Sequence, residues 1–399
     1  MKLTENYIKN VLLSLICTLF VVANSSFLIF GQIVSYLSIL MGLAGMVVLV
    51  WCKCCYSFKV FESVVKYIFI ILCIELFQLL RGQDVFDFER LVMRGMTYCI
   101  FLCAATSSYE GFSFVNKLTT EKLWKIITGL VCLLSLLYIA LSFTGRGGGN
   151  NGRFVSDESL NPVGVATVYS SLLCILVLAG LLHKAWFWRF TSYLGAAVSL
   201  YAVVLTGSRG GLAAALVVIS LILYLIFRGR DKKKFNKVLY FFIALCVAAG
   251  VATTKYADKF SKISNRFQSI GSDSDLSGDA RISYWQELWE CSDEWLLFGW
   301  SQYSGKYPHN MFYELALRFG VLGMAISIGV LVIGFRIFKV ANEFRNHVTY
   351  LCATMFFFNF LAAMTSLGLE HQKWLAWSIG IYFAFRALQK QLFVSLTEQ

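Results

Sequence analysis

The stretch VVLTGSRGGLAAALVV, residues 203–218, sets a single arginine between two long apolar runs. Arg209 stands in a turn of glycine and serine, and the apolar sequence continues on both sides beyond the quoted residues. A helix needs about 20 apolar residues to cross the hydrocarbon core of a bilayer, and each flanking run is close to that length. Because a charged side chain next to lipid is costly, we expect Arg209 to face the protein interior at one membrane surface.

The same apolar pattern recurs along nearly the whole chain. Of its 399 residues, 58% are hydrophobic and 15% are charged, whereas about a quarter are charged in a soluble domain. The runs are continuous, so they predict helices rather than the alternating strands of a membrane barrel. The fold class is therefore an all-α polytopic membrane protein, with residues 1–399 as one integral-membrane domain. About twelve spans of crossing length are predicted, at residues 9–29, 33–52, 62–80, 91–106, 124–144, 161–182, 188–206, 211–228, 237–254, 319–338, 348–367 and 374–389.

Basic loops predict the orientation of these spans. The sequences RGRDKKKFNK (228–237) and KVANEFR (339–345) are the clearest cytoplasmic markers, because Lys and Arg concentrate in cytoplasmic loops. This orientation puts both termini in the cytoplasm and one long hydrophilic loop, residues 255–309, on the other side. The net charge of +12 then reflects membrane topology, and no nucleic-acid partner is expected.

Several arginines nevertheless fall on the predicted extracytoplasmic side, against the usual bias. They are Arg81, Arg90 and the nearby Arg94, Arg146 and Arg153 in the Gly-rich sequence TGRGGGNNGRF, Arg209 in its turn, and Arg266 and Arg281 in the long loop. A planar guanidinium donates two parallel hydrogen bonds to a phosphate, so a phosphate-bearing ligand is one explanation for the set. The alternative is that individual arginines extend toward lipid headgroups.

The centre of the long loop reads DARISYWQELWECSDEWLLFGW, residues 279–300. Its apolar residues recur at helical spacing, which predicts short amphipathic helices packed at the membrane surface. Arg281 falls in a first helical turn, where the helix dipole disfavours a cation. Either the nearby Asp279 or an anionic ligand is needed to explain it. The acidic turn before it lacks the glutamate of a calcium loop, since Tyr284 takes that position, and no metal site is expected.

A second helix start follows in HNMFYELALRFGVLG, residues 309–323. Asn310, Glu314 and Arg318 are four residues apart and share one face, which makes them candidates for substrate binding. Glu preceding Arg at this spacing is also a stabilising pair, so the two residues could simply satisfy each other.

His309 stands directly after Pro308, one of only two prolines in the chain. Proline restrains the residue before it to extended geometry and fixes the angle at which the chain enters the helix. A histidine held in this way on the arginine-rich side is suited to proton transfer, since the ordinary pKa of histidine is about 6.5. The alternative is a helix cap or a surface group.

Taken together, TGSRGG between two spans, the loop pattern ending in FGW, and HNMFYELALRFGVLG opening the next span resemble the O-antigen ligase and polymerase superfamily. The resemblance covers about residues 144–338. It implies a GT-C-like membrane fold in the bacterial inner membrane, with the active face periplasmic. The implied reaction moves an oligosaccharide from undecaprenyl pyrophosphate to an acceptor hydroxyl, without a metal or other cofactor.

Carried over by motif, the resemblance assigns catalytic roles to Arg209, Arg281 and His309. The two arginines would hold the pyrophosphate leaving group, and His309 would be the base that takes the proton of the acceptor hydroxyl. Arg153, which precedes the sixth predicted span, would join the phosphate clamp, and Arg146 on the same arm is a further candidate for substrate binding.

Two activities share this donor chemistry and differ in the acceptor. A polymerase joins repeat units on the lipid carrier, and a chain-length regulator is then a candidate partner; a ligase moves the finished glycan onto lipid A–core. We favour the polymerase because the chain is rich in Phe (35) and Tyr (19) and its long loop is modest. A transporter of lipid-linked glycans is a further alternative, which would need the arginines but not His309.

Overall fold

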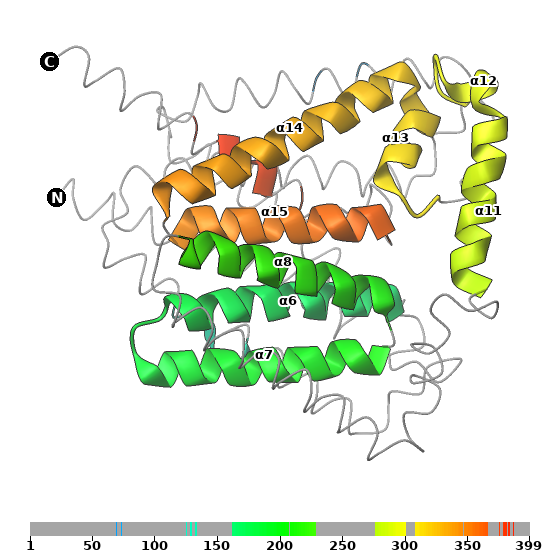
Figure 1. Ribbon diagram of the computed structural model, residues 1–399. Coiled ribbons are helices and arrows are strands. Elements are labelled where there is room, and N and C mark those ends of the chain that lie inside the picture. The colour runs from blue at the N-terminus through cyan, green and yellow to red at the C-terminus, as the bar shows by residue number, and fades with distance from the viewer. Residues whose placement is uncertain are drawn as a thin grey trace, which may run out of the picture.

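The computed structural model describes residues 162–206, 208–228, 276–300, 308–345 and 347–365, with isolated residues at 69–133 and 375–386. The predicted spans at 9–29, 33–52, 62–80, 91–106, 124–144, 237–254 and 374–389 lie wholly or largely outside the described residues. The helices (Figure 1) are α6 (Pro162–Leu182), α7 (Trp186–Thr206), α8 (Arg209–Phe227), α11 (Leu276–Glu290), α12 (Ser292–Trp295), α13 (Met311–Phe319), α14 (Val321–Phe344) and α15 (His347–Thr365).

Apolar helices of membrane-crossing length dominate the described part of the chain. Four of them have the length and composition to cross a bilayer: Val163–Leu182, Trp186–Thr206, Arg209–Phe227 and Val321–Phe344. The first three agree within two residues with the predicted spans at 161–182, 188–206 and 211–228, because polar turns bound each apolar run. The chain is thus an all-helical, multi-pass membrane protein over these residues.

The predicted span at 319–338 agrees with the structure within two residues at its start and ends six residues too early. A short helix, α13, precedes it, and α14 continues to Phe344. The two helices are separated at Gly320, which adopts φ +58°. A left-handed residue interrupts the helical hydrogen-bond ladder and turns the chain, so the apolar pattern that runs through Gly320 does not form one straight helix.

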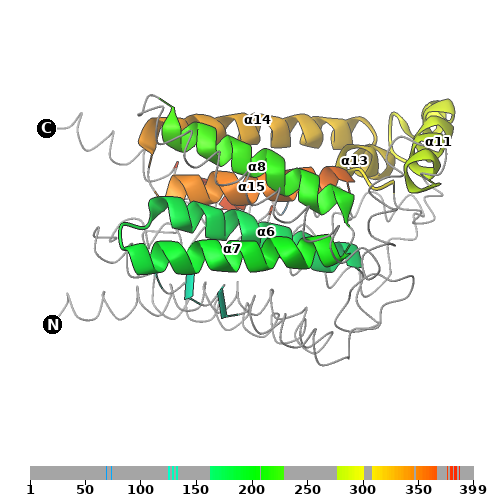
Figure 2. The ribbon, with the colours of Figure 1, turned by 60° about the horizontal axis from the view of Figure 1, so that its bottom comes forward.

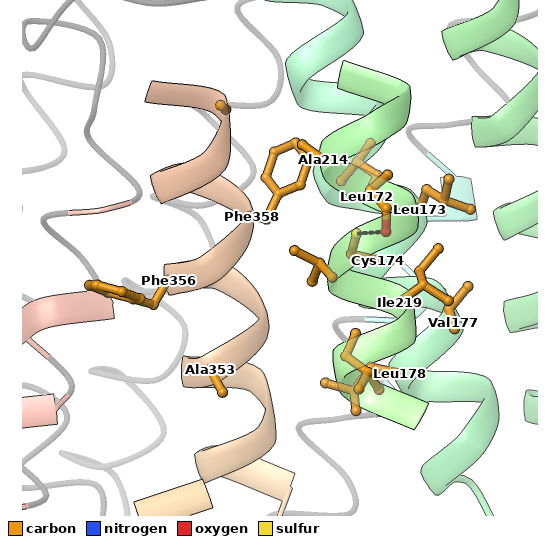
Figure 3. Packing of buried hydrophobic residues seen from close by; sticks show 14 of the residues in the cluster. Leu172, Leu173, Cys174, Val177, Leu178, Ala214, Ile219, Ala353, Phe356 and Phe358 are labelled. Atoms are coloured by element: carbon orange, nitrogen blue, oxygen red, sulfur yellow. Dashed lines mark hydrogen bonds between the residues drawn. The ribbon is translucent and has the colours of Figure 1, made fainter. Parts of the chain in front are cut away.

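Helix α6 is the centre of the bundle, packed between α7 on one side and α8 and α15 on the other (Figure 2). Small residues allow this close approach, as membrane helices require. A side chain on Gly195 of α7 would contact Leu176 of α6, and the Cys174 thiol of α6 lies 3.8 Å from the Ala215 carbonyl oxygen of α8. Phe358 of α15 points into the same core (Figure 3).

The directions of the helices decide which ends lie together. The Tyr350 hydroxyl, near the start of α15, donates to the carbonyl oxygen of Leu225, near the end of α8, at 3.4 Å. These two helices are therefore antiparallel, and α15 ends where α8 begins. Helix α6 also begins there, and α7 ends there (Figure 1). We call this end of the bundle the Arg209 end.

Helix α11 lies across the Arg209 end, crosswise to the long helices (Figure 1). Beneath it, Leu288 of α11 and Trp295 of α12 form a small buried core with Leu317 of α13. The Trp295 indole N–H donates to the Leu288 carbonyl oxygen at 2.8 Å, which satisfies its polar atom inside this core. Helices do form over the predicted segment at 279–300, as α11 and α12 joined at Cys291. Its apolar residues do not share one buried face, because Leu288 is buried whereas Ile282 and Trp289 are exposed.

Candidate active site

Arg209 is the first residue of α8, and the residues before it form a helix cap. The Ser208 hydroxyl accepts from the Gly211 N–H at 3.5 Å, and the Ser208 N–H lies 3.4 Å from the Thr206 hydroxyl. No acidic residue occupies the first turn of α8. A helix N-terminus carries positive partial charge, so the guanidinium adds to a field that already favours an anion.

Arg281 contacts the opposite kind of helix end. Its Nη1 donates to the carbonyl oxygen of Thr365, the last residue of α15, at 3.1 Å. The C-terminus of a helix carries negative partial charge, so α15 stabilises this cation. The predicted first-turn position of Arg281 is wrong, because α11 begins at Leu276 and Arg281 is its sixth residue. This contact is an explanation for Arg281 that the sequence reasoning, which considered only Asp279 and an anionic ligand, missed.

His309 occupies a strained bend before α13. Its φ is +53°, in the left-handed region that costs a side-chain-bearing residue about 1–2 kcal/mol. The bend is held from α11, because the Trp285 indole N–H donates to the Pro308 carbonyl oxygen at 2.7 Å. The Trp285 ring also stacks on Tyr313 of α13, with ring centres 5.8 Å apart. Strain of this kind persists only where the surroundings enforce it, and it is commonest at functional sites.

Asn310, rather than His309, caps α13. Its side-chain oxygen accepts from the N–H groups of Phe312 at 2.9 Å and Tyr313 at 3.3 Å. The alternative that His309 is itself the helix cap is therefore wrong, which leaves its half-buried imidazole outside the capping arrangement. Asn310 has a structural task that accounts for its position, and its predicted substrate contact stays a prediction.

Glu314 and Arg318 form the ion pair that their spacing indicates. Arg318 Nη2 lies 2.7 Å from Glu314 Oε1, and the Glu314 side chain is 0% exposed. A buried carboxylate requires such a partner, since an unpaired one would be strongly destabilising. The structural alternative is thus confirmed, and a role of either residue in substrate binding stays a prediction.

Two glycines let the segment that follows α12 pass close to the junction of α13 and α14. Gly299 adopts φ +81°, and a Cβ on it would overlap the Arg318 carbonyl; a Cβ on Gly320 would overlap the Leu297 backbone. This close crossing lets the Trp300 N–H donate to the Leu317 carbonyl oxygen at 2.7 Å. The reasoning from sequence assigned neither glycine a role, although both stand within the quoted motifs FGW and LRFGVLG.

Named contacts connect the three predicted catalytic residues to the Arg209 end. Arg209 begins α8 there, and Arg281 binds the end of α15 beside it. One turn along α11 from Arg281, Trp285 holds the bend that contains His309. Arg146 and Arg153 lie outside the described residues.

The fold and this cluster define the class: a polytopic α-helical membrane protein with two arginines and a histidine gathered at one end of its bundle. Residues 194–328 match the family described as O-antigen ligase, so this stretch of the chain is an O-antigen ligase family domain. It runs from α7 into α14 and contains Arg209, Arg281 and His309. The family consists of membrane glycosyltransferase-like enzymes whose glycan transfer is of the ligase or polymerase type. No curated protein matches the chain.

Proposed function

We propose that the protein is a polysaccharide polymerase, which transfers a glycan from undecaprenyl pyrophosphate to the hydroxyl of an acceptor sugar. The observation that carries the proposal is the gathering of Arg209, Arg281 and His309 at one end of the bundle from three separate elements, α8, α11 and the bend before α13. The family of residues 194–328, with its lipid-linked glycan substrates, supports the same reaction class.

The chemistry needs two kinds of group, and the cluster contains both. The acceptor oxygen attacks the anomeric carbon, and the bond from that carbon to the pyrophosphate oxygen breaks. The departing pyrophosphate takes the bonding electrons, so its growing charge is met by the Arg209 and Arg281 guanidinium groups and by the start of α8. His309 takes the hydroxyl proton as the new bond forms. Fixed arginines do this work without a metal, so transfer is expected to persist in EDTA.

A transfer assay with purified protein and a lipid-linked oligosaccharide tests the proposal. His309→Ala should lower the rate by about 10²–10⁴-fold, the usual contribution of a positioned base. Arg209→Ala should weaken donor binding, whereas Arg228→Ala at the far end of α8 should change neither quantity. If His309→Ala leaves product formation unchanged while Arg209→Ala abolishes binding, a carrier of lipid-linked glycans replaces the enzyme.

The ligase is the second candidate, since the matched family is described as O-antigen ligase. The two activities differ in what they need as acceptor. A polymerase given only the lipid-linked donor should produce a ladder of longer lipid-linked chains. A ligase should produce nothing until lipid A–core is added, and then a glycosylated core.

We also propose that the Arg209 end faces the periplasm of the bacterial inner membrane, with both chain termini in the cytoplasm. The support is the run of basic residues in 228–237, directly after α8 at the opposite end of that helix. A fluorescent protein fused after residue 228 or at the C-terminus should fluoresce, and one fused after residue 206 should not. The reverse pattern would invert the orientation.

A further inference from the structure

Two residues of α11, Arg281 and Trp285, donate hydrogen bonds to other elements. Arg281 and Trp285 are four residues apart, so they share one face of the helix. Arg281 binds the end of α15, and Trp285 binds the residue before His309. One turn of α11 therefore connects Arg281, which is predicted to bind the phosphate, with the bend that contains His309, the predicted base.

The bond from Trp285 differs from that of the neighbouring Trp295. Trp295 is 2% exposed, and its indole donates to Leu288, seven residues away. Its contact is local and belongs to the small core under α11. Trp285 is only partly buried and donates over 23 residues to Pro308, whose carbonyl group is part of the peptide bond that enters His309.

The stack of Trp285 on Tyr313 gives this contact a second point of attachment. The two rings are nearly parallel, 16° apart, and Tyr313 lies in the first turn of α13. The indole thus holds the chain on both sides of His309, at Pro308 before it and at Tyr313 after it. A bend whose central residue has φ +53° needs such support, because a side-chain-bearing residue otherwise relaxes to negative φ.

We propose that Trp285 is a positioning residue: its indole fixes the Pro308–His309 bend against α11 and so sets the imidazole relative to Arg281 for proton removal from the acceptor. This inference rests on the proposed function of His309 as the base. Trp285 touches no reacting atom and acts through His309. A displacement of about 1 Å at a reacting group costs on the order of 10²-fold in rate, so loss of one hydrogen bond to this bend is enough to be measured.

Trp285→Phe is the main variant, since it keeps an aromatic ring that can stack on Tyr313 and removes the N–H donor together with the five-membered ring of the indole. Trp289→Phe is its control, because Trp289 lies one turn further along α11 with its side chain 64% exposed. We expect Trp285→Phe to lower kcat about 10–100-fold with KM for the lipid-linked donor within about twofold of the parent. Trp289→Phe should change neither constant by more than about twofold.

A double-mutant cycle separates this proposal from that of the base. In the His309→Ala background, Trp285→Phe should have no further effect on kcat, because its only route to the reaction has been removed. The positioning role would be overturned if the rate loss of the double variant equalled the product of the two single losses. It would also be overturned if Trp285→Phe had the same kcat as Trp289→Phe. In either case the base would survive. An unchanged rate for His309→Ala would overturn the base itself, and the positioning role with it.

A side chain closer in shape to tryptophan separates loss of the N–H donor from misfolding of Trp285→Phe. Benzothienylalanine at position 285 has nearly the shape of tryptophan and a sulfur in place of the N–H. It should reproduce the loss of kcat in protein that elutes and melts like the parent. Parent-like kcat in this variant would show that ring packing, rather than the hydrogen bond to Pro308, is what the reaction needs, and would overturn the inference.

Discussion

Arg281 donates a hydrogen bond to the carbonyl oxygen of Thr365, although 84 residues separate them in the chain. The bond joins the first turns of a helix that lies across the bundle to the last residue of a helix within it. It places a guanidinium at the negative end of α15, beside the start of α8 where Arg209 stands. Two cations from distant parts of the sequence thereby share one end of the protein.

Replacing Arg209 by lysine should keep the charge and lose most of the activity. Lysine presents a point charge and cannot donate two parallel hydrogen bonds to a phosphate group. We expect kcat/KM for the lipid-linked donor to fall by at least about tenfold, which corresponds to about 1.4 kcal/mol. Arg228→Lys is the matched control, because Arg228 follows the last residue of the same helix and packs over the Tyr224 ring. Equal effects of the two variants would argue against a pyrophosphate at Arg209.

The positive φ of His309 should affect the stability of the protein independently of catalysis. His309→Gly should unfold at a higher temperature than His309→Ala, since glycine adopts φ +53° without the cost of about 1–2 kcal/mol that alanine carries. Both variants lack the imidazole and should be equally inactive. Arg345, with φ +47° at the end of α14, is the comparison site. Arg345→Gly should show the same stability difference from Arg345→Ala and retain activity; melting curves of the four purified variants decide the matter.

The glycine between α13 and α14 should be intolerant of a side chain. Gly320→Ala would place a Cβ against the Leu297 backbone in a left-handed conformation, and we expect a loss of about 1–3 kcal/mol in stability. Gly329→Ala, in the middle of α14, should be neutral or stabilise by up to about 1 kcal/mol, since a Cβ there meets no atom within 4 Å. The measurement is the fraction of monodisperse protein after heating. Equal tolerance of both substitutions would contradict the close crossing at Gly320.

The buried ion pair should respond to substitution unlike an exposed one. Glu314→Ala removes the carboxylate that faces the largely buried Arg318 guanidinium, which is expected to cost about 3–5 kcal/mol. Replacing both residues, as Glu314→Leu with Arg318→Met, should restore much of that stability. The pair Lys339–Glu343 has the same spacing at 3.9 Å but is exposed, so Glu343→Ala should change stability by less than about 1 kcal/mol. If the double variant is stable but has lost glycan-transfer activity, the predicted substrate contact of these residues gains support.

Helices α6, α7 and α8 could be predicted closely, whereas the break at Gly320 could not. Each of the three helices is a continuous apolar run bounded by polar residues, and length alone then indicates a membrane span. Gly320 lies at the start of an apolar run, and glycine is common within membrane helices, so its identity does not reveal a bend. The bend results from the Leu297 backbone packing against it, which is a contact between segments that the sequence does not order in space.

The candidate site divides in the same way. The sequence contains the residue types of Arg209, Arg281 and His309 and their nearness to predicted helix starts, and it predicts that they lie on one side of the membrane. The sequence did not indicate that Arg281 donates to Thr365 or that Trp285 holds the bend at Pro308.

Sequence by itself determined the helical membrane class and the chemistry available, because apolar length and side-chain type are local properties. Only the tertiary structure decided that α8, α11 and α13 meet at one end, because their meeting depends on the packing of α15 against α8 and on glycines that let backbones touch.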